Sequence, residues 1–373
     1  MRKRLKKLER YNPFKDRTPV QRWNAAQYLM ITLLSFAASI SGTRLFLEVT
    51  GFPRLESGEI HIAHVLWGGL LLFIGALLPL ILANEWGLRL SALLTGLGIG
   101  LFIDEVGKFI TQTNDYFHPV AAPIVYVFFL LTVLLFAFIR NRRKSSSRAD
   151  MYEILERFNE VLDHDLSTEE YRGLLQRLDN VIAAAELRSL VELAESMRDY
   201  LKTNRSRVVP DDPIFIERIR AALQRFEKNW LVPKRFKKVV VLGLLIWGVW
   251  ALVSPIGYLL ITRDAAQLSA FVDQLISNRL VRNASGLNWF EARVLIEGGV
   301  GVLAILSAIM VLFKFEKRGV MLGIVDLLVT LTIVNPLVFY FEQFSTLIVA
   351  AFQFILLILL IRYRKRLQRM ENE

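Results

Sequence analysis

Eight stretches of the chain are apolar over about twenty residues each, which is the length that a helix needs to cross the hydrocarbon core of a bilayer. They cover residues 24–47, 60–83, 88–111, 119–139, 239–262, 292–313, 320–340 and 346–361. The chain is 54% hydrophobic and has 25 phenylalanines, which is more apolar surface than one soluble core of 373 residues needs. We therefore predict an all-α membrane protein with eight transmembrane helices in the lipid bilayer.

Lysine and arginine gather next to these stretches and predict their orientation. Clusters occur in the N-terminal leader and at residues 140–148, 233–238 and 362–369, which all fall on one side of the membrane if there are eight spans. Such a bias marks the cytoplasmic side, so we expect both termini in the cytoplasm. The basic clusters that give the net charge of +11 would then attract anionic lipid at the cytoplasmic face. We therefore expect no nucleic-acid partner.

A polar segment divides the spans into two groups of four. Its apolar residues recur at helical spacing, first around residues 151–162 and again around 214–226, and "STEE" (167–170) has the pattern of a helix N-terminal capping box. We predict a leader and first four-helix half over residues 1–144, a cytoplasmic helical insert over 145–234 and a second four-helix half over 235–373. The insert has no phosphate loop or catalytic motif, so we expect it to regulate, to oligomerise or to dock a protein partner.

Short motifs align between the two halves and predict an internal duplication. "WGG" (67–69) matches "EGG" (297–299), and "IRNRRK" (139–144) matches "IRYRKR" (361–366). Each half has an even number of spans, so tandem copies would share one orientation, unlike inverted repeats. Chance similarity between leucine-rich helices is the alternative.

The stretch "GLFIDEVGKF" (100–109) places two acids and a lysine inside the third span, where an ionisable side chain costs several kcal/mol. In the predicted topology the acids lie about 10 Å below the outer end of this span. Histidines begin the second span from the same side, and the loop after the third span adds an acid and a histidine. Neighbouring helical residues lie about 100° apart, so we expect only one of the two acids to join the cluster. The candidate ligands are His61, His64, His118, Asp115 and either Asp104 or Glu105.

Three interpretations of this cluster stay open. In the structural one, Lys108 pairs with Asp104 at i+4 or Glu105 at i+3, and the histidines bond to backbone or interfacial water. In the second, imidazole and carboxylate bind a divalent metal, with zinc the leading candidate and a metal-bound water available for hydrolysis. In the third, a histidine–carboxylate pair titrates as a proton or ion relay. The chain has no cysteine, which excludes thiolate ligands and nucleophiles.

The second half has no histidine but carries its own intramembrane polar residues. Arg293 stands four residues before Glu297, which predicts an ion pair within the sixth span. Asp326 and Asn335 add polarity to the seventh span. The "NP" dipeptide (335–336) predicts a distorted helix with freed carbonyls that line a cavity or are satisfied by neighbours. This half is predicted to serve as a scaffold or as a second polar pathway.

The motifs "HIAHVLWGGLLL" (61–72), "GLFIDEVGKFIT" (100–111) and "NDYF" (114–117) resemble a recurring pattern in uncharacterised bacterial polytopic membrane proteins. The resemblance implies a bacterial inner-membrane location. The histidine and carboxylate pattern is more distantly similar to membrane hydrolases of the ceramidase type, which use a fuller set of His, Asp and Ser on seven spans. We expect transport or sensing of a small solute or ion. The alternatives are a metal-dependent membrane hydrolase with a lipid-like substrate, and a membrane scaffold that docks a partner through the insert.

Overall fold

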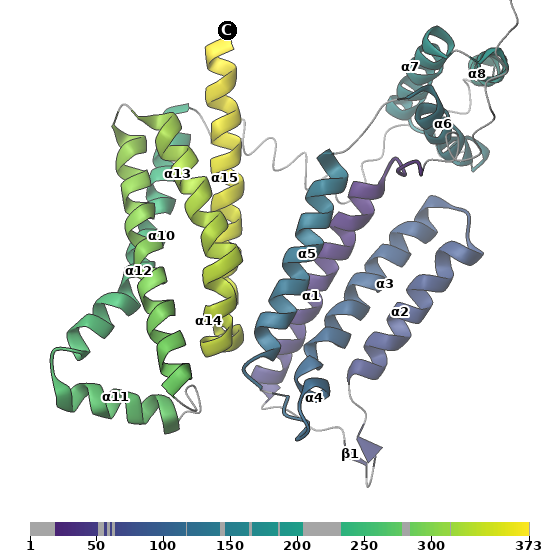
Figure 1. Ribbon diagram of the computed structural model, residues 1–373. Coiled ribbons are helices and arrows are strands. Elements are labelled where there is room, and N and C mark those ends of the chain that lie inside the picture. The colour runs from purple at the N-terminus through teal and green to yellow at the C-terminus, as the bar shows by residue number, and fades with distance from the viewer. Residues whose placement is uncertain are drawn as a thin grey trace, which may run out of the picture.

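The computed structural model of the protein is almost entirely helical (Figure 1). It describes residues 19–50, 56–57, 60–61, 64–116, 118–141, 146–163, 166–185, 187–203, 233–277, 284–313 and 315–372.

Eight of the helical segments among the described residues are long and apolar enough to cross a membrane, as predicted. The first half contributes α1 (Ala25–Thr50), α2 (His64–Ile81), α3 (Glu85–Asp104) and α5 (Ala121–Asn141). The second half contributes α10 (Pro233–Ile261), α12 (Ala284–Leu312), α15 (Leu347–Asn372) and one composite span. That span consists of α13 (Glu316–Val329), the π-helix η2 (Thr330–Val334) and α14 (Asn335–Glu342). The chain is therefore a polytopic membrane protein.

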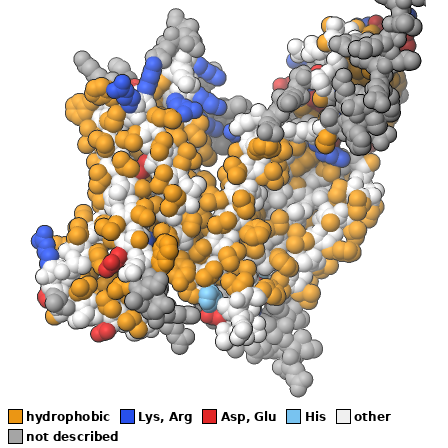
Figure 2. Space-filling view, in the orientation of Figure 1, with side chains coloured by type: hydrophobic (Ala, Val, Ile, Leu, Met, Phe, Trp, Pro, Cys, Tyr) orange, Lys and Arg blue, Asp and Glu red, His pale blue; other side chains and the backbone are white. Residues whose placement is uncertain are grey.

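Charged side chains define the two ends of the bundle. Figure 2 shows hydrophobic side chains over the flanks of both halves, with lysine and arginine gathered at the end where α15 finishes. We call this the basic end, and the other the opposite end. The apolar flanks provide the surface that lipid would cover.

Short elements lie at the opposite end (Figure 1). They are the antiparallel strands β1 (Glu56–Ser57) and β2 (Ile60–His61), the helix α4 (Val106–Ile110), the helix α11 (Ala265–Ser277) and the 3₁₀ helix η3 (Gln343–Thr346). The breaks that separate α3 from α4 and α14 from α15 bring loop residues beside the ends of the spans. This arrangement positions the candidate site.

The two halves pack around different central helices. In the first half α3 packs against both α1 and α2, whereas in the second α12 packs against both α10 and α13. Glycine permits the close approach of α1 and α3, because a Cβ at Gly96 would lie 1.9 Å from Ser35 Oγ. The predicted duplication equates α2 with α12, and these two helices have different neighbours. The duplication therefore stays a prediction.

The polar segment forms helices at the basic end, beyond the ends of α1 and α5 (Figure 1). They are α6 (Ser147–Leu162), α7 (Thr168–Ala184) and α8 (Arg188–Thr203), around an apolar core of its own. The capping box before α7 is present: Glu170 N donates to Ser167 Oγ at 3.3 Å, and Ser167 N donates to Glu170 Oε2 at 3.0 Å. The second predicted apolar pattern, around residues 214–226, lies outside the described residues.

The segment formed by α6–α8 contacts the start of α1. The Trp23 ring lies between two guanidinium groups, with Arg157 Cζ 4.6 Å and Arg177 Cζ 4.2 Å from its centroid. Next to it, Arg22 Nη1 lies 2.8 Å from Glu156 Oε1.

Candidate functional site

The carboxylate of Asp104 is the centre of a polar cluster at the opposite end. Asp104 is the last residue of α3 and is 0% exposed. Arg44 Nε, from α1, donates to Oδ1 at 2.7 Å, and the Tyr116 hydroxyl donates to Oδ2 at 2.5 Å. His64 Nε2, from the first residue of α2, lies 3.2 Å from Oδ2. A buried acid is tolerated here because three donors from three segments surround it.

Glu105 joins the same cluster, which corrects the expectation that only one acid could do so. Its Oε1 lies 2.9 Å from His64 Nδ1 and 3.3 Å from Lys108 Nζ. The expectation assumed a continuous helix, but α3 ends at Asp104 and α4 begins at Val106. Glu105, at φ −88° and ψ 8°, turns the chain between them, so both carboxylates reach His64. The predicted i+3 pair of Lys108 with Glu105 is confirmed.

A glycine allows α4 to pack against the loop that carries Tyr116. A Cβ at Gly107 would lie 2.8 Å from the carbonyl oxygens of both Asp115 and Tyr116. Any larger residue would push this loop away from α4. The Tyr116 hydroxyl would then lose its contact with the carboxylate.

The imidazole of His64 bridges the two carboxylates. Each ring nitrogen faces a carboxylate oxygen, and an ionised carboxylate only accepts hydrogen bonds. The ring satisfies both acids when it donates from both nitrogens, which is the imidazolium form. The side chain of His64 is 26% exposed, so solvent can reach the ring while Asp104 stays dry.

Arg44 connects the cluster to the second half of the protein. Its guanidinium carbon lies 4.5 Å from the centroid of the Tyr116 ring and 4.1 Å from that of Phe344, a residue of η3. These contacts with the two rings help to orient the guanidinium toward the carboxylate of Asp104. The site is thus built from α1, α2, the α3–α4 junction and one wall from the second half.

Sequence reasoning missed two of these partners. Arg44 lies 60 positions from Asp104, and Tyr116 lies in a loop. One signal for Arg44 was available: a single arginine inside the first apolar run requires a buried acid from another run. No comparable pattern in the sequence indicates the tyrosine.

The formal charge of the cluster changes with the protonation of His64. Two carboxylates balance the guanidinium and the lysine, so the net charge is zero with a neutral imidazole and positive with an imidazolium. Besides the phenol of Tyr116, the ionisable groups are Arg44, His64, Asp104, Glu105 and Lys108. One proton therefore changes the charge of a largely buried site.

His118, a further predicted ligand, lies apart from the cluster. His118 Nδ1 accepts a hydrogen bond from Val120 N at 3.4 Å, and among the described residues its side chain has no contact with the cluster. Asp115 N donates to Thr111 Oγ1 at 2.8 Å. His61 belongs to β2, paired with Glu56, so it does not share a helical face with His64 as expected. The side chain of His61 lies outside the described part.

A metal site receives no support from this arrangement. Within the described ranges, no group of three or more His, Cys, Asp or Glu side chains is arranged to hold a metal ion. The oxygens of Asp104 and Glu105 already accept from Arg44, Tyr116 and Lys108. The zinc site therefore stays a prediction.

The second half has its own polar contacts near the opposite end. Arg293 Nη2 lies 3.3 Å from Glu297 Oε2, which confirms the predicted i+4 pair, and it also pairs with Glu342 at the end of α14. Tyr258 donates to Glu291 Oε1 at 2.8 Å. These contacts join α10, α12 and α14.

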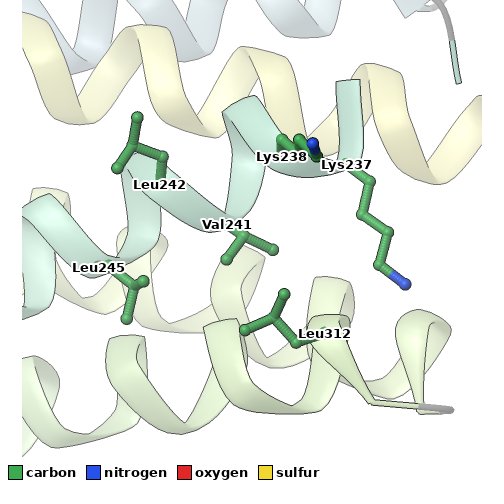
Figure 3. A pocket seen from close by; sticks show the side chains of 6 residues that line it. All are labelled: Lys237, Lys238, Val241, Leu242, Leu245 and Leu312. Carbon is green, nitrogen blue, oxygen red and sulfur yellow. The ribbon is translucent and has the colours of Figure 1, made fainter. Parts of the chain in front are cut away.

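A groove of about 410 Å³ lies near the basic end between α10 and α12 (Figure 3). Leucine and valine form most of its surface, and two lysines lie at one end. The lining residues are Lys237, Lys238, Val241, Leu242, Leu245 and Leu312. No acid or histidine lines it, so it offers apolar contact and positive charge rather than catalytic groups.

Comparison with protein-family models, with curated proteins and with solved structures finds no match for this chain.

Proposed function

We propose that this polytopic membrane protein senses a small ion, the proton, at His64 and transmits the signal to the helices α6–α8. The observation that carries the proposal is the imidazole held between the carboxylates of Asp104 and Glu105. Histidine is the side chain whose ordinary pKa allows its charge to change near physiological pH.

Loss of the proton from His64 would rearrange the cluster. A neutral imidazole donates from one nitrogen and presents a lone pair at the other, which would repel the carboxylate that faces it. The ring must then leave either Asp104 or Glu105, while each acid keeps its other donors. Because His64 is the first residue of α2, this change would shift α2 relative to the α3–α4 junction.

The hairpin of α2 and α3 connects the cluster to the helices α6–α8. It starts at His64, turns near Asn84 at the basic end and returns to Asp104. At the turn, Asn84 Nδ2 donates to Asp163 Oδ2 at 2.7 Å, and Glu85 shares a hydrogen bond with Glu160 of α6. A rearrangement at one end of the hairpin can thus alter contacts at the other.

The proposed setting follows from charge. We place the basic end in the cytoplasm of a bacterium, with both termini there and the His64 cluster toward the outer face of the inner membrane. Anionic lipid at the inner leaflet would contact the groove through Lys237 and Lys238. The α6–α8 segment would then pass the signal to a cytoplasmic protein partner.

Distance measurements between two spin labels test the proposal. The chain has no cysteine, so Ala83→Cys and Asn159→Cys give one label at the hairpin turn and one on α6. In oriented vesicles with fixed internal pH, raising the external pH should change the distance between the labels. His64→Gln should abolish the response, and His118→Gln, the matched control, should retain it.

Two outcomes would reject sensing. An equal response in His64→Gln and in the parent would show that another group titrates. No distance change, together with proton flux into the vesicles that His64→Gln abolishes, would indicate transport instead.

A further inference from the structure

The carboxyl group of Asp326 is buried in the middle of the seventh span, with no cation beside it in the described part of the chain. It is 1% exposed, and neither oxygen has a hydrogen-bond partner within the described part of the chain. The indole N–H of Trp247, from α10, lies close enough to act on the carboxyl but misses hydrogen-bond geometry. One turn further, the buried hydroxyl of Thr330 has no partner among the described residues either. We call these three residues the Asp326 group.

Apolar residues surround the Asp326 group. Asp326 lies ten residues into a span that begins at Glu316, about 15 Å along the helix, which is close to the middle of a bilayer core. Its neighbours in the span, Ile324 and Leu327, belong to the apolar core of the second half. Within the described ranges, no lysine, arginine or histidine forms an ion pair with Asp326.

Two other polar side chains of the surrounding helices are engaged elsewhere. Ser307 of α12 donates to Gly319 O at 2.8 Å, and Gln353 of α15 accepts from Asn335 Nδ2 at 2.7 Å. A lone carboxylate at this depth would cost several kcal/mol. A proton removes that charge and supplies an O–H that can donate.

The π-helix that follows Asp326 carries a further polar contact, which joins the seventh span to the first half. Asn335 N donates to Thr330 O in the i→i−5 pattern, and Pro336 has no N–H to continue it. The next carbonyl, Leu331 O, is therefore free and accepts from the Tyr126 hydroxyl of α5 at 2.9 Å. This confirms that a neighbouring helix satisfies a carbonyl freed by the "NP" dipeptide. Such π segments are frequent at functional sites.

We propose that Asp326 binds an exchangeable proton inside the membrane, so that the second half contains a proton-binding site separate from the His64 cluster. The carboxylate takes up one proton and becomes a neutral carboxylic acid, and release reverses this step. This site does not depend on the proposed function.

Infrared difference spectroscopy tests the proposal without a reagent that must enter the core. The parent spectrum minus that of Asp326→Asn should show, at about pH 5, the carbonyl stretch of one protonated carboxyl above the amide band, although an ordinary aspartate is ionised at that pH. The band should weaken as the pH rises, because the carboxyl releases its proton. The band should shift in D₂O because the proton exchanges. Asp264→Asn, which changes an acid at the start of α11, should leave the band in place.

Labelling with dicyclohexylcarbodiimide, which modifies protonated carboxyls in apolar surroundings, provides a second readout. The peptide with Asp326 should carry the adduct in the parent, and Asp104 should not, because it is held by Arg44. Absence of the infrared band across the whole pH range would overturn the proposal, since Asp326 would then be ionised. A band that does not shift in D₂O would also overturn it, because the proton would be trapped.

Discussion

Each half of the protein buries one aspartate in an apolar span, and the two are treated in opposite ways. Asp104 has a guanidinium, an imidazole and a phenol on its oxygens, whereas Asp326 has no partner in the described part of the chain. The difference follows from depth. Asp104 ends α3, where a loop and two other helices can reach it, but among the described residues no cation reaches Asp326 in the middle of the seventh span. Asp104 is therefore compensated by cations and, we propose, Asp326 by a proton.

The largest expected effect comes from removing the cation beside Asp104. Arg44→Met should lower the free energy of unfolding by about 3–5 kcal/mol, because it leaves a buried carboxylate with too few donors. Unfolding in detergent, followed by circular dichroism, measures the loss. Arg22→Met, which removes an exposed pair with Glu156, should cost about 1 kcal/mol or less. Equal effects of the two variants would contradict the compensation of Asp104.

A smaller loss should follow from removing the donor to the π-helix. Tyr126→Phe leaves Leu331 O buried without its hydrogen bond, which should cost about 1–3 kcal/mol in the same assay. Tyr340→Phe is the matched control, because the Tyr340 hydroxyl has no hydrogen-bond partner in the described residues. If Tyr126→Phe behaves like this control, the carbonyl has another donor.

A third prediction concerns the contact of α6 with the start of α3. Burial, and next the hydrogen bond with Glu85, raises the pKa of the Glu160 carboxyl to about 8. The folded protein thus binds this proton more tightly than the unfolded chain does. The contact is therefore strongest below the ordinary glutamate pKa and weakens as the pH rises toward about 8.

Hydrogen exchange of the α6 amides, corrected for the intrinsic effect of pH, should follow this weakening. Glu160→Gln mimics the protonated carboxyl and should keep α6 protected at high pH. Loss of protection in the variant at the same pH as in the parent would show that another group titrates.

The smallest effect is expected at Asp326. Because a protonated, unpartnered carboxyl is already neutral, Asp326→Asn should change the free energy of unfolding by less than about 1 kcal/mol. Asp326→Leu should be neutral or stabilising, since an apolar residue suits the site. A loss as large as that of Arg44→Met would mean that Asp326 has a partner.

Patterns confined to one helix could be predicted from the sequence, but contacts between distant segments could not. Apolar length gave the eight spans, and i+3 or i+4 spacing gave the pairs of Lys108 with Glu105 and of Arg293 with Glu297. The helix break at Glu105 depends on packing around Gly107, so a continuous-helix rule wrongly excluded one acid. Contacts between Arg44 and Asp104 join residues 60 positions apart. Whether Asp326 has a hydrogen-bond partner depends on the side chains of neighbouring helices, so the sequence of its own span does not show it.

A double-mutant cycle between Arg44 and Asp104 tests most directly whether charge compensation holds the buried acid of the first half. Arg44→Met and Asp104→Leu should each destabilise by several kcal/mol, because the first leaves the Asp104 carboxylate with too few donors and the second leaves the Arg44 guanidinium without its acid. The double variant should lose much less than the sum, with a coupling of about 1–3 kcal/mol. If the losses of the two single variants add up to that of the double variant to within about 0.5 kcal/mol, Arg44 does not compensate the charge of Asp104.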